Sequence, residues 1–444
     1  MKYFQFDSSF LHSVLEEALR NGGEYADLFF EDTKINNISY LDKKVDDMSL
    51  GNNYGVGLRV IVDKKTIYLY SNDTSNDSLI NLARSVSSIV KNKKHIVKDF
   101  IKSAEKDNHP VHINPFDVNF DEKIETLAYL DKTARKVSDK IKQVSARYME
   151  KERNILVCTS NGILKEDSQT YIRLVMMSMA SDGTNTQTSS RTKGALDGFQ
   201  VIRDINLENM AIETANSAIK MLDSKYPKSG KYPVVIDNAF GGVIFHEACG
   251  HALEATSVAD NASVFCNKLG EKIASDVVTA IDDGTIKNAW GSYNIDDEGN
   301  DAQRTVLIEN GILKSYLVDE LGSIKMNQKV TGSARRESYK YAPTSRMRNT
   351  FIDKGSSTFE ELISGIEYGL YAKKMGGGSV DPATTDYNFA VSEGYLIENG
   401  KITKPVRGAT LIGHLLFVPS PSGDVSFSGC RRWGKQSARS CVQQ

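Results

Sequence analysis

The pentapeptide Leu-Ile-Glu-Asn-Gly occurs twice in the second half of the chain, at residues 307–311 and 396–400. An Asn-Gly pair between alternating apolar residues is the strongest short signal for a two-residue β-hairpin of type I′, because both turn residues need a positive φ. Two such hairpins predict that this half folds mainly as antiparallel β-sheet. Shared turn chemistry explains the repeat more simply than a duplicated structural unit.

Helix-like and strand-like patterns alternate in the first half of the chain. Apolar residues at helical spacing predict helices over 8–21, 76–91, 121–141 and 207–222. Runs rich in β-branched and aromatic residues predict strands over 25–30, 37–41, 57–62, 66–70, 144–153, 155–159 and 171–180. Asn52-Asn53 is expected to separate strands, and the polar stretch 181–194 is expected to be an exposed or mobile loop.

The segment from Lys225 to Pro233 contains two prolines and interrupts these patterns before a short strand at 234–236. We therefore expect two domains, 1–223 and 224–444. The predicted fold class is α+β. An N-terminal α/β domain would contain a mixed sheet, and a C-terminal, mainly antiparallel β domain would carry the histidine-bearing helix described below.

The charge of the chain is nearly balanced, with 55 Lys and Arg against 57 Asp and Glu. This balance gives no global attraction to nucleic acid or to an anionic membrane. Apolar runs stay well short of the roughly 18 residues of a membrane span, and the first residues lack the apolar core of a secretory signal. The five cysteines are scattered, without a Cys-x-x-Cys pair, so we expect a reducing, cytoplasmic environment.

Two of the seven histidines lie within one short motif, His246-Glu247-Ala-Cys-Gly-His251, on the helix expected after the strand at 234–236. Imidazoles are good zinc ligands, and a carboxylate beside the metal can accept the proton of bound water. A metal site is therefore one hypothesis for this segment. A helix with two hydrogen-bonded histidines and a salt-bridged glutamate is the other.

The five-residue spacing of the two histidines imposes a local distortion if they share one cation. On a regular α-helix, five steps of about 100° place the two side chains roughly 140° apart. A π-type turn brings residues five apart back towards one face. We therefore predict a π-bulge or kink from Cys249 to His251, which Gly250 could permit.

Hydrolytic zinc usually takes three protein ligands and keeps one position open for water. Glu254, three residues after His251, or a distant cysteine could supply the third ligand. Cys249 lies inside the motif but points elsewhere on a helix, so it is expected to be a small packed thiol.

A longer pattern surrounds the motif, which continues as His-Glu-Ala-Cys-Gly-His-Ala-Leu-Glu. Its other parts are the segments 281–284, 295–299, 306–314, 332–339, 346–350, 376–381 and 408–413. Together they resemble the TldD-like branch of the TldD/PmbA family of metallopeptidases. Residues 1 to about 220 resemble the family's N-terminal domain more loosely.

The resemblance implies a two-domain α/β protein that dimerises around an internal chamber, with a copy of itself or with a related subunit that lacks the zinc motif. It implies a zinc peptidase of small or unfolded peptides, with His246 and His251 as Zn2+ ligands and Glu247 as the general base. The family's third ligand is a cysteine in a C-terminal Cys-Gly-Lys-x-Gly-Gln stretch. This chain has an altered form, Cys430 followed by Gly-Lys-Gln at 434–436, so Cys430 is the expected third ligand.

The altered tail leaves a second function open, a catalytically impaired peptide-binding or scaffold subunit of the same family. A third is a metallohydrolase of another amide, such as a formyl group, since a Cys-His-His site beside a glutamate also suits deformylation.

Two further features could contact a peptide. The run Gly376, Gly377 and Gly378 could lie along an extended substrate, because backbone without side chains can be approached closely, or could form a plain turn. Four arginines could hold a peptide carboxylate, although structural ion pairs are their commoner role: Arg335, Arg336, Arg346 and Arg348.

Overall fold

A computed structural model describes residues 2–90, 96–101, 107–238, 242–381, 384 and 386–414 of the chain. Within these residues, no helix has both the length and the apolar character needed to cross a membrane.

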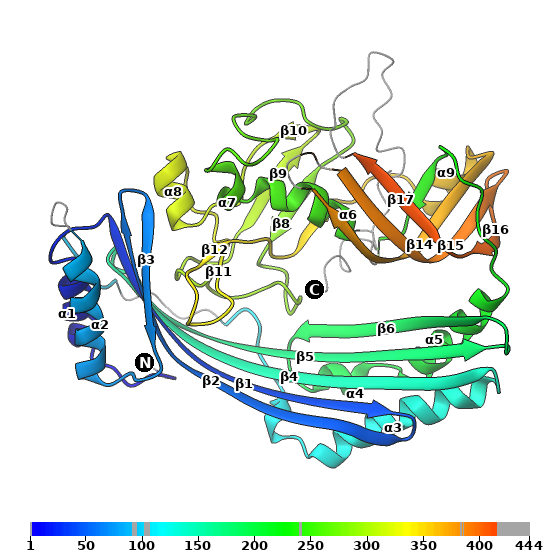
Figure 1. Cartoon of the computed structure of the whole chain (residues 1–444), viewed down its shortest axis with the longest axis horizontal. Helices are drawn as coiled ribbons and strands as arrows, with labels where there is room; N and C mark the ends of the chain where they lie inside the picture. The colour runs from blue at the N-terminus through cyan, green and yellow to red at the C-terminus, as the bar shows by residue number, and fades with distance from the viewer. Residues whose placement is uncertain are drawn as a thin grey trace.

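The first half is built on one long sheet of six strands in the order β3-β2-β1-β4-β5-β6. The strands are β1 (Tyr25–Leu41), β2 (Lys44–Val62), β3 (Lys65–Ser71), β4 (Ile141–Thr159), β5 (Leu164–Ser181) and β6 (Thr186–Leu196). The helices are α1 (Ser8–Ala18), α2 (Asn76–Ile89), the 3-10 helix η1 (Pro115–Asp117), α3 (Phe120–Val137), α4 (Gln200–Asp204) and α5 (Leu207–Leu222). Figure 1 shows the strands side by side as a curved platform along the molecule.

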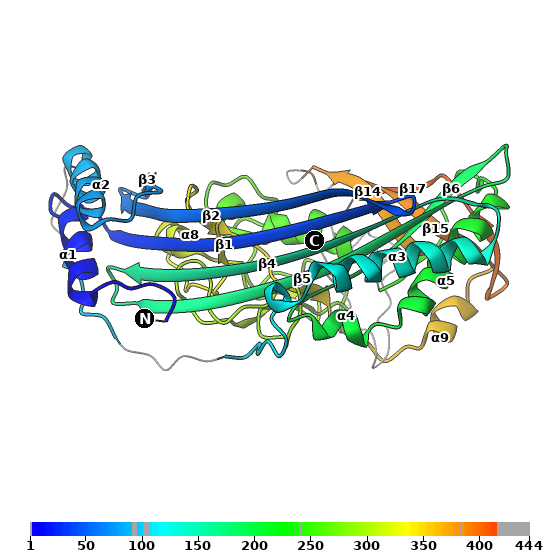
Figure 2. The ribbon, with the colours of Figure 1, turned by 90° about the horizontal axis from the view of Figure 1, so that it is seen from below.

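The helices cover one face of this platform because side chains alternate along each strand. In β1, Leu28 and Phe30 pack in the core formed with α1 and α2, whereas Phe29 clusters with Tyr339 of the second half. Farther along the same face, Ile38 belongs to the core formed with α3 and α5. Figure 2 shows α3 and α5 lying over the strands, with α1 and α2 at one end.

The prediction of a mixed sheet in the first half is wrong, because every strand pair of this sheet is antiparallel. Tight turns join the first three strands. Asp42 and Lys43 between β1 and β2 both have positive φ, as do Asp63 and Lys64 between β2 and β3. These turns have the conformation of type I′ hairpins but lack the Asn-Gly signature, so their hairpin geometry was not predicted.

Two predicted loops in the first half are strands. Asn52 and Asn53 lie inside β2, opposite Lys34 and Thr33 of β1. Most of the polar stretch 181–194 belongs to β6, which pairs with β5 along the edge of the sheet. Edge strands are commonly polar and need no apolar alternation, and this explains why the pattern resembled a loop.

The second half contains several smaller sheets. Its strands are β7 (Val234–Ile236), β8 (Ala280–Asp283), β9 (Arg304–Glu309), β10 (Ile312–Leu313), β11 (Ala334–Arg335), β12 (Thr344–Ser345), β13 (Thr350–Ile352), β14 (Tyr368–Val380), β15 (Asp386–Glu398), β16 (Lys401–Val406) and β17 (Ala409–His414). Its helical segments are α6 (Gly242–Phe245), the π-turn η2 (His246–Gly250), the 3-10 turn η3 (His251–Leu253), α7 (Ala255–Val258), α8 (Glu320–Met326) and α9 (Phe359–Ser364).

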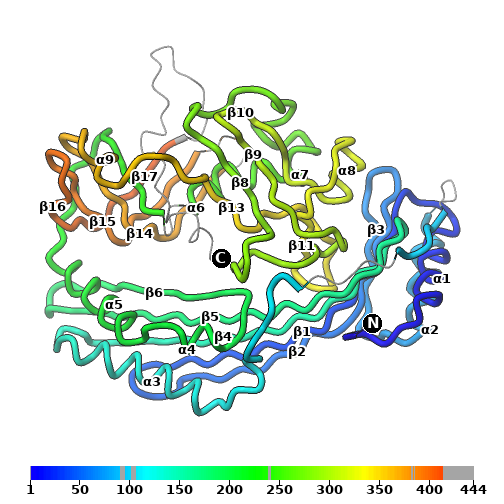
Figure 3. The backbone as a smooth tube through the Cα atoms, turned by 180° about the vertical axis from the view of Figure 1, so that it is seen from behind, coloured from blue at the N-terminus to red at the C-terminus, as the bar shows by residue number. Residues whose placement is uncertain are grey.

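The strand pairs of the second half are antiparallel except for β7 with β14, as the two Asn-Gly signals predict. Asn310 and Gly311 connect β9 to β10 with φ values of 48° and 82°, and Asn399 and Gly400 connect β15 to β16 with 50° and 73°. The two hairpins belong to different sheets, so the repeated pentapeptide reflects the same turn type and not a duplicated structural unit. Figure 3 shows the second half stacked on the face of the long sheet opposite α3 and α5.

Buried ion pairs join the two halves. Arg59 of β2 is fully buried, donates from Nε to Asp27 at 2.7 Å and pairs through Nη2 with Glu298 at 2.8 Å. Arg336 of the second half donates to the other oxygen of Asp27 at 2.5 Å. The alternation that buries Leu28 against helices therefore turns Asp27 towards the second half.

Arg153 of β4 makes a second link on the same face of the sheet. Its two terminal nitrogens donate to the two oxygens of Asp297 at 2.8 and 3.0 Å. Glu31 of β1 lies beside Arg153 and also accepts the backbone N–H of Tyr339 at 2.7 Å. Such two-pronged pairs fix orientation as well as distance. The division into domains at residue 223 stays a prediction, but these contacts set how the two halves sit together.

Replacing Arg59 with Met should lower the free energy of unfolding by about 3–5 kcal/mol, because Glu298 stays buried without its cation. Urea denaturation of the full chain measures this change. Arg20→Met is the matched control, since Arg20 is exposed and its pair with the partly buried Glu17 should contribute less than about 1 kcal/mol. Equal stability of Arg59→Met and wild type would show that the link does not hold the halves together.

Candidate metal centre

The helix that carries the two histidines widens by one residue at the motif. The single turn of α6 runs into η2, where the backbone N–H of His251 donates to the carbonyl of His246, five residues earlier. A tighter 3-10 turn, η3, follows directly. The predicted π-type distortion at Cys249 to His251 is confirmed.

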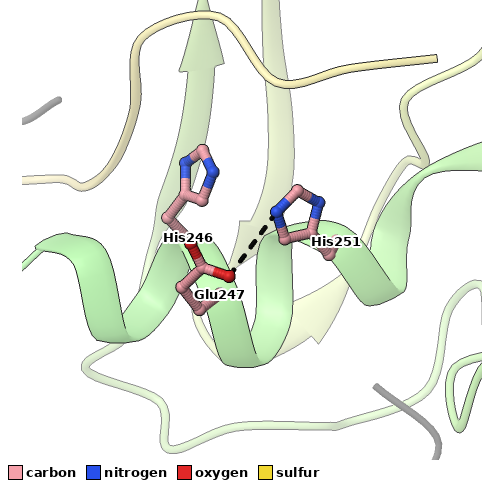
Figure 4. Close-up of side chains that lie close together, drawn as sticks. All are labelled: His246, Glu247 and His251. Carbon is pink, nitrogen blue, oxygen red and sulfur yellow. Dashed lines mark ion pairs between the residues drawn. The ribbon is translucent and has the colours of Figure 1, made fainter. Parts of the chain in front are cut away.

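The widened turn brings the two imidazoles together. Their ring centroids are 4.9 Å apart and the rings are nearly perpendicular, at 88°. One ligand atom each from His246, Glu247 and His251 can be chosen so that all lie within 4.8 Å of one another. The Nε2 atom of His251 lies 3.7 Å from a carboxylate oxygen of Glu247. Figure 4 draws this contact as a dashed line. The three side chains thus surround a space of the size that one small cation requires.

Glycine is needed at position 250 because a side chain would not fit there, and not because the backbone is unusual. Its φ and ψ are −57° and −50°, ordinary helical values that any residue adopts. A Cβ atom at this position would lie 2.0 Å from the sulfur of the buried Met347. The expectation that glycine permits the distortion through backbone freedom is therefore replaced by a steric reason.

Glu254 lies behind His251 and fixes the orientation of its ring. This carboxylate is almost fully buried and lies 3.1 Å from Nδ1 of His251. It also accepts from Nη1 of Arg346 at 2.8 Å and from the backbone N–H of Met347 at 3.3 Å. A carboxylate on Nδ1 sets the tautomer that leaves Nε2 as an acceptor on the side of Glu247. These contacts suit an orienting group better than the third ligand that the sequence left open.

Burial, aided by the neighbouring imidazole of His251 and the positive charges of Arg335 and Arg346, lowers the pKa of His246 to about 4. The imidazole is therefore neutral near pH 7, and a neutral ring has the free lone pair that metal binding requires.

Other predicted site residues lie apart from this cluster or outside the described chain. Cys249 is fully buried in the apolar core of the second half, where burial raises the pKa of its thiol, in keeping with a packed residue. Cys430 lies outside the described residues.

The three glycines of the predicted loop belong to strand β14, at a point where the register with β15 shifts. A Cβ at Gly378 would lie 2.2 Å from the carbonyl oxygen of Asn388, so glycine is required there by strand packing. Gly376 meets only ordinary contacts and Gly377 has open space around it. The strand also packs beside the π-turn. A role of these glycines in substrate binding stays a prediction.

Sequence reasoning did not find Arg346 and Met347 as neighbours of the motif. Their link to Glu254 spans about 90 residues of chain and leaves no periodic signal. The three-residue spacing from His251 to Glu254 did indicate proximity, but spacing alone does not reveal which ring nitrogen the carboxylate meets.

Models of one protein family match the chain in three consecutive stretches. The first domain of the PmbA/TldA metallopeptidases matches residues 26–90, their central domain residues 113–222 and their C-terminal domain residues 229–418.

Relatives of known name cover most of the chain. A metalloprotease of Methanocaldococcus jannaschii is 37% identical over 410 residues, which are 90% of this chain and 89% of that protein. A protein named metalloprotease TldD homolog, from Haemophilus influenzae, is 36% identical over 405 residues, with coverage of 88% and 83%.

Solved structures share the fold at lower identity. A Thermotoga maritima protein described as a candidate modulator of a DNA gyrase superposes with a TM-score of 0.78 at 22% identity, and TldE of Thermococcus kodakarensis with 0.76 at 16%. Each comparison covers 92% of both chains. At these identities the likeness shows the fold alone, and it confirms the α+β class.

Proposed function

The chain belongs to the PmbA/TldD metallopeptidase family, and we propose that it is a zinc-dependent peptidase of small or unfolded peptides. His246 and His251 are the proposed ligands and Glu247 the proposed general base. The observation that carries the proposal is the π-turn, which brings these three side chains around one space.

The residues present fit a zinc ion. Two imidazole nitrogens beside a carboxylate match the donor types that zinc takes in hydrolases, and Glu254 provides the carboxylate–histidine contact that commonly supports such ligands. We propose Cys430 as the third protein ligand, which would leave one coordination position open.

When bound, zinc would supply a Lewis acid that polarises the peptide carbonyl and eases loss of a proton from water. Glu247 then accepts the proton of the attacking water and passes it to the leaving amine. Glu254 keeps the His251 ring in place throughout, because Arg346 and the backbone of Met347 hold its carboxylate.

Strand β14 supports the proposed path of the peptide. β7 pairs only with Leu370–Ala372 of β14. The remainder of β14, up to Val380, therefore has no paired strand on its β7 edge among the described residues. Gly376 and Gly377 lie in this part; Gly376 is partly exposed and Gly377 is exposed. An extended peptide would add its backbone to such an edge, with Gly376, Gly377 and Gly378 as its contact.

The Glu247→Gln variant should keep about one zinc per chain and lose peptide cleavage by at least about 100-fold, because an amide cannot accept the proton. Amine release from unblocked peptides, assayed beside a formyl-peptide, measures the activity and separates peptidase from deformylase. Glu309→Gln is the control, since Glu309 is exposed on β9.

Equal cleavage by Glu247→Gln and wild type would remove Glu247 from the mechanism. A wild-type chain that holds no zinc after purification in zinc would instead support the peptide-binding or scaffold subunit.

Glu254→Gln should weaken zinc affinity by about 10–100-fold while the fold persists, because the amide cannot set the tautomer of His251 as the carboxylate does. Competition with a chromogenic chelator measures the affinity, and thermal unfolding of the metal-free protein checks the fold. Unchanged zinc affinity in a folded Glu254→Gln protein would contradict the orienting role.

A dimer, of two copies or with a related subunit that lacks the zinc motif, is the proposed assembly. Support comes from β2, whose residues 44–53 are almost all exposed and lie beyond the reach of β3, which pairs only with Val56–Val62. Light scattering should give twice the 49.1 kDa of one chain for the homodimer. A chain that stays monomeric alone and with a related subunit would contradict the proposed assembly.

A further inference from the structure

Of the four arginines that the sequence offers for a peptide carboxylate, three are used by the fold. Arg336 is buried and pairs with Asp27. Arg346 pairs with Glu254 at 2.8 Å. Arg348 donates to a backbone carbonyl and lies over the ring of Tyr293, 4.0 Å from its centroid. These three residues follow the commoner, structural role of arginine.

Arg335 differs from the other three arginines. Its side chain is exposed, and its guanidinium makes no ion pair or hydrogen bond with any residue that the structure describes. A guanidinium is a rigid fork of N–H donors that matches a carboxylate. The fork of Arg335 is thus available to a ligand.

The backbone around Arg335 places it beside the metal centre. In the β11–β12 pair, Arg335 lies opposite Thr344, and the next residue of that strand, Ser345, accepts the backbone N–H of Thr256 just after Glu254. Arg346 follows and holds Glu254 itself.

A second cation without a counter-ion lies on the sheet below. Lys151 of β4 shares a face with Arg153, two residues on, and its ammonium lies over the ring of Tyr171, 5.5 Å from the centroid. In the described part of the chain its ammonium has no ion pair or hydrogen bond. Burial and the charge of Arg153, with a smaller effect of Arg335, lower the pKa of Lys151 to about 8.

The nearest acidic groups are already engaged. Glu254 binds His251 and Arg346, and Asp297 binds Arg153 through both oxygens. Glu247 adds a carboxylate to the site, but a cation bound beside it would offset that charge, and Arg335 and Lys151 would still have no ion-pair partner among the described residues. An anionic group of the ligand is the remaining source of compensation.

We infer that Arg335, with Lys151 as the supporting charge, binds a carboxylate of the peptide and so selects substrates that carry one near the cleaved bond. The carboxylate could be the peptide's C-terminus or an acidic side chain, which the same fork would bind. This inference rests on the proposed function, because it names the substrate class of that site.

Peptide binding to zinc-loaded Glu247→Gln protein tests the inference without cleavage. The probes are three dye-labelled tetrapeptides: one of alanine with a free C-terminus, the same peptide as the C-terminal amide, and an amidated peptide that ends in Glu. Fluorescence anisotropy gives each Kd. At least one carboxylate-bearing peptide should bind about tenfold more tightly than the alanine amide, and which one does so identifies the source.

Adding Arg335→Gln should abolish this preference and leave binding of the alanine amide unchanged, and Arg335→Lys should retain part of it. Arg304→Gln is the matched control, because Arg304 is also exposed but faces Asp283. Thermal unfolding confirms that each variant is folded. Equal weakening of all three peptides by Arg335→Gln, or a preference that survives it, would overturn the inference.

The two proposals fail in different ways. A protein that binds the carboxylate peptides through Arg335 but whose wild type cleaves none of them would refute the peptidase and keep the inference. A wild type that cleaves the amide and both carboxylate peptides with equal kcat/KM, and binds them equally, would refute the inference and keep the peptidase.

Discussion

One backbone hydrogen bond, from the N–H of His251 to the carbonyl of His246, sets the geometry on which the site depends. A regular helix would place these side chains roughly 140° apart, and the two imidazoles could not then bind the same metal ion. The wider turn costs helix regularity, and the packing of Met347 against Gly250 and the contacts of Glu254 offset that cost. The site is therefore maintained by its surroundings as much as by its own sequence.

The same surroundings connect the site to the long sheet. Asp297, which binds Arg153 of β4, also accepts the backbone N–H of Arg336, the neighbour of Arg335. The ion pairs between the halves thus fix the β11–β12 region whose continuation, Arg346, holds Glu254. One buried network thus supports both the proposed metal centre and the inferred substrate-binding position of Arg335, although the residues concerned are far apart in the chain.

Local signals in the sequence predicted local structure well. The two Asn-Gly turns, helix α5 and the π-turn follow from spacing and from residue types that limit the backbone. The turn at Asp42-Lys43 was missed because this pair lacks the Asn-Gly signature that indicates positive φ. The pairing of Asp27 with Arg336 could not be predicted, since contacts across 309 residues leave no periodicity in the chain. Glu254 was predicted to lie close to His251 and to be a possible third ligand, but its contact with Nδ1 of His251 was not predicted.

Diffraction at the zinc absorption edge, from crystals of the full chain grown with zinc, tests the central claim most directly. We expect an anomalous peak about 2.0–2.1 Å from one ring nitrogen of His246 and of His251, with Glu247 beside it. Rings that point apart on a regular helix, with no peak between them, would contradict the claim. The chain would then have the fold of the family but no zinc site at His246 and His251.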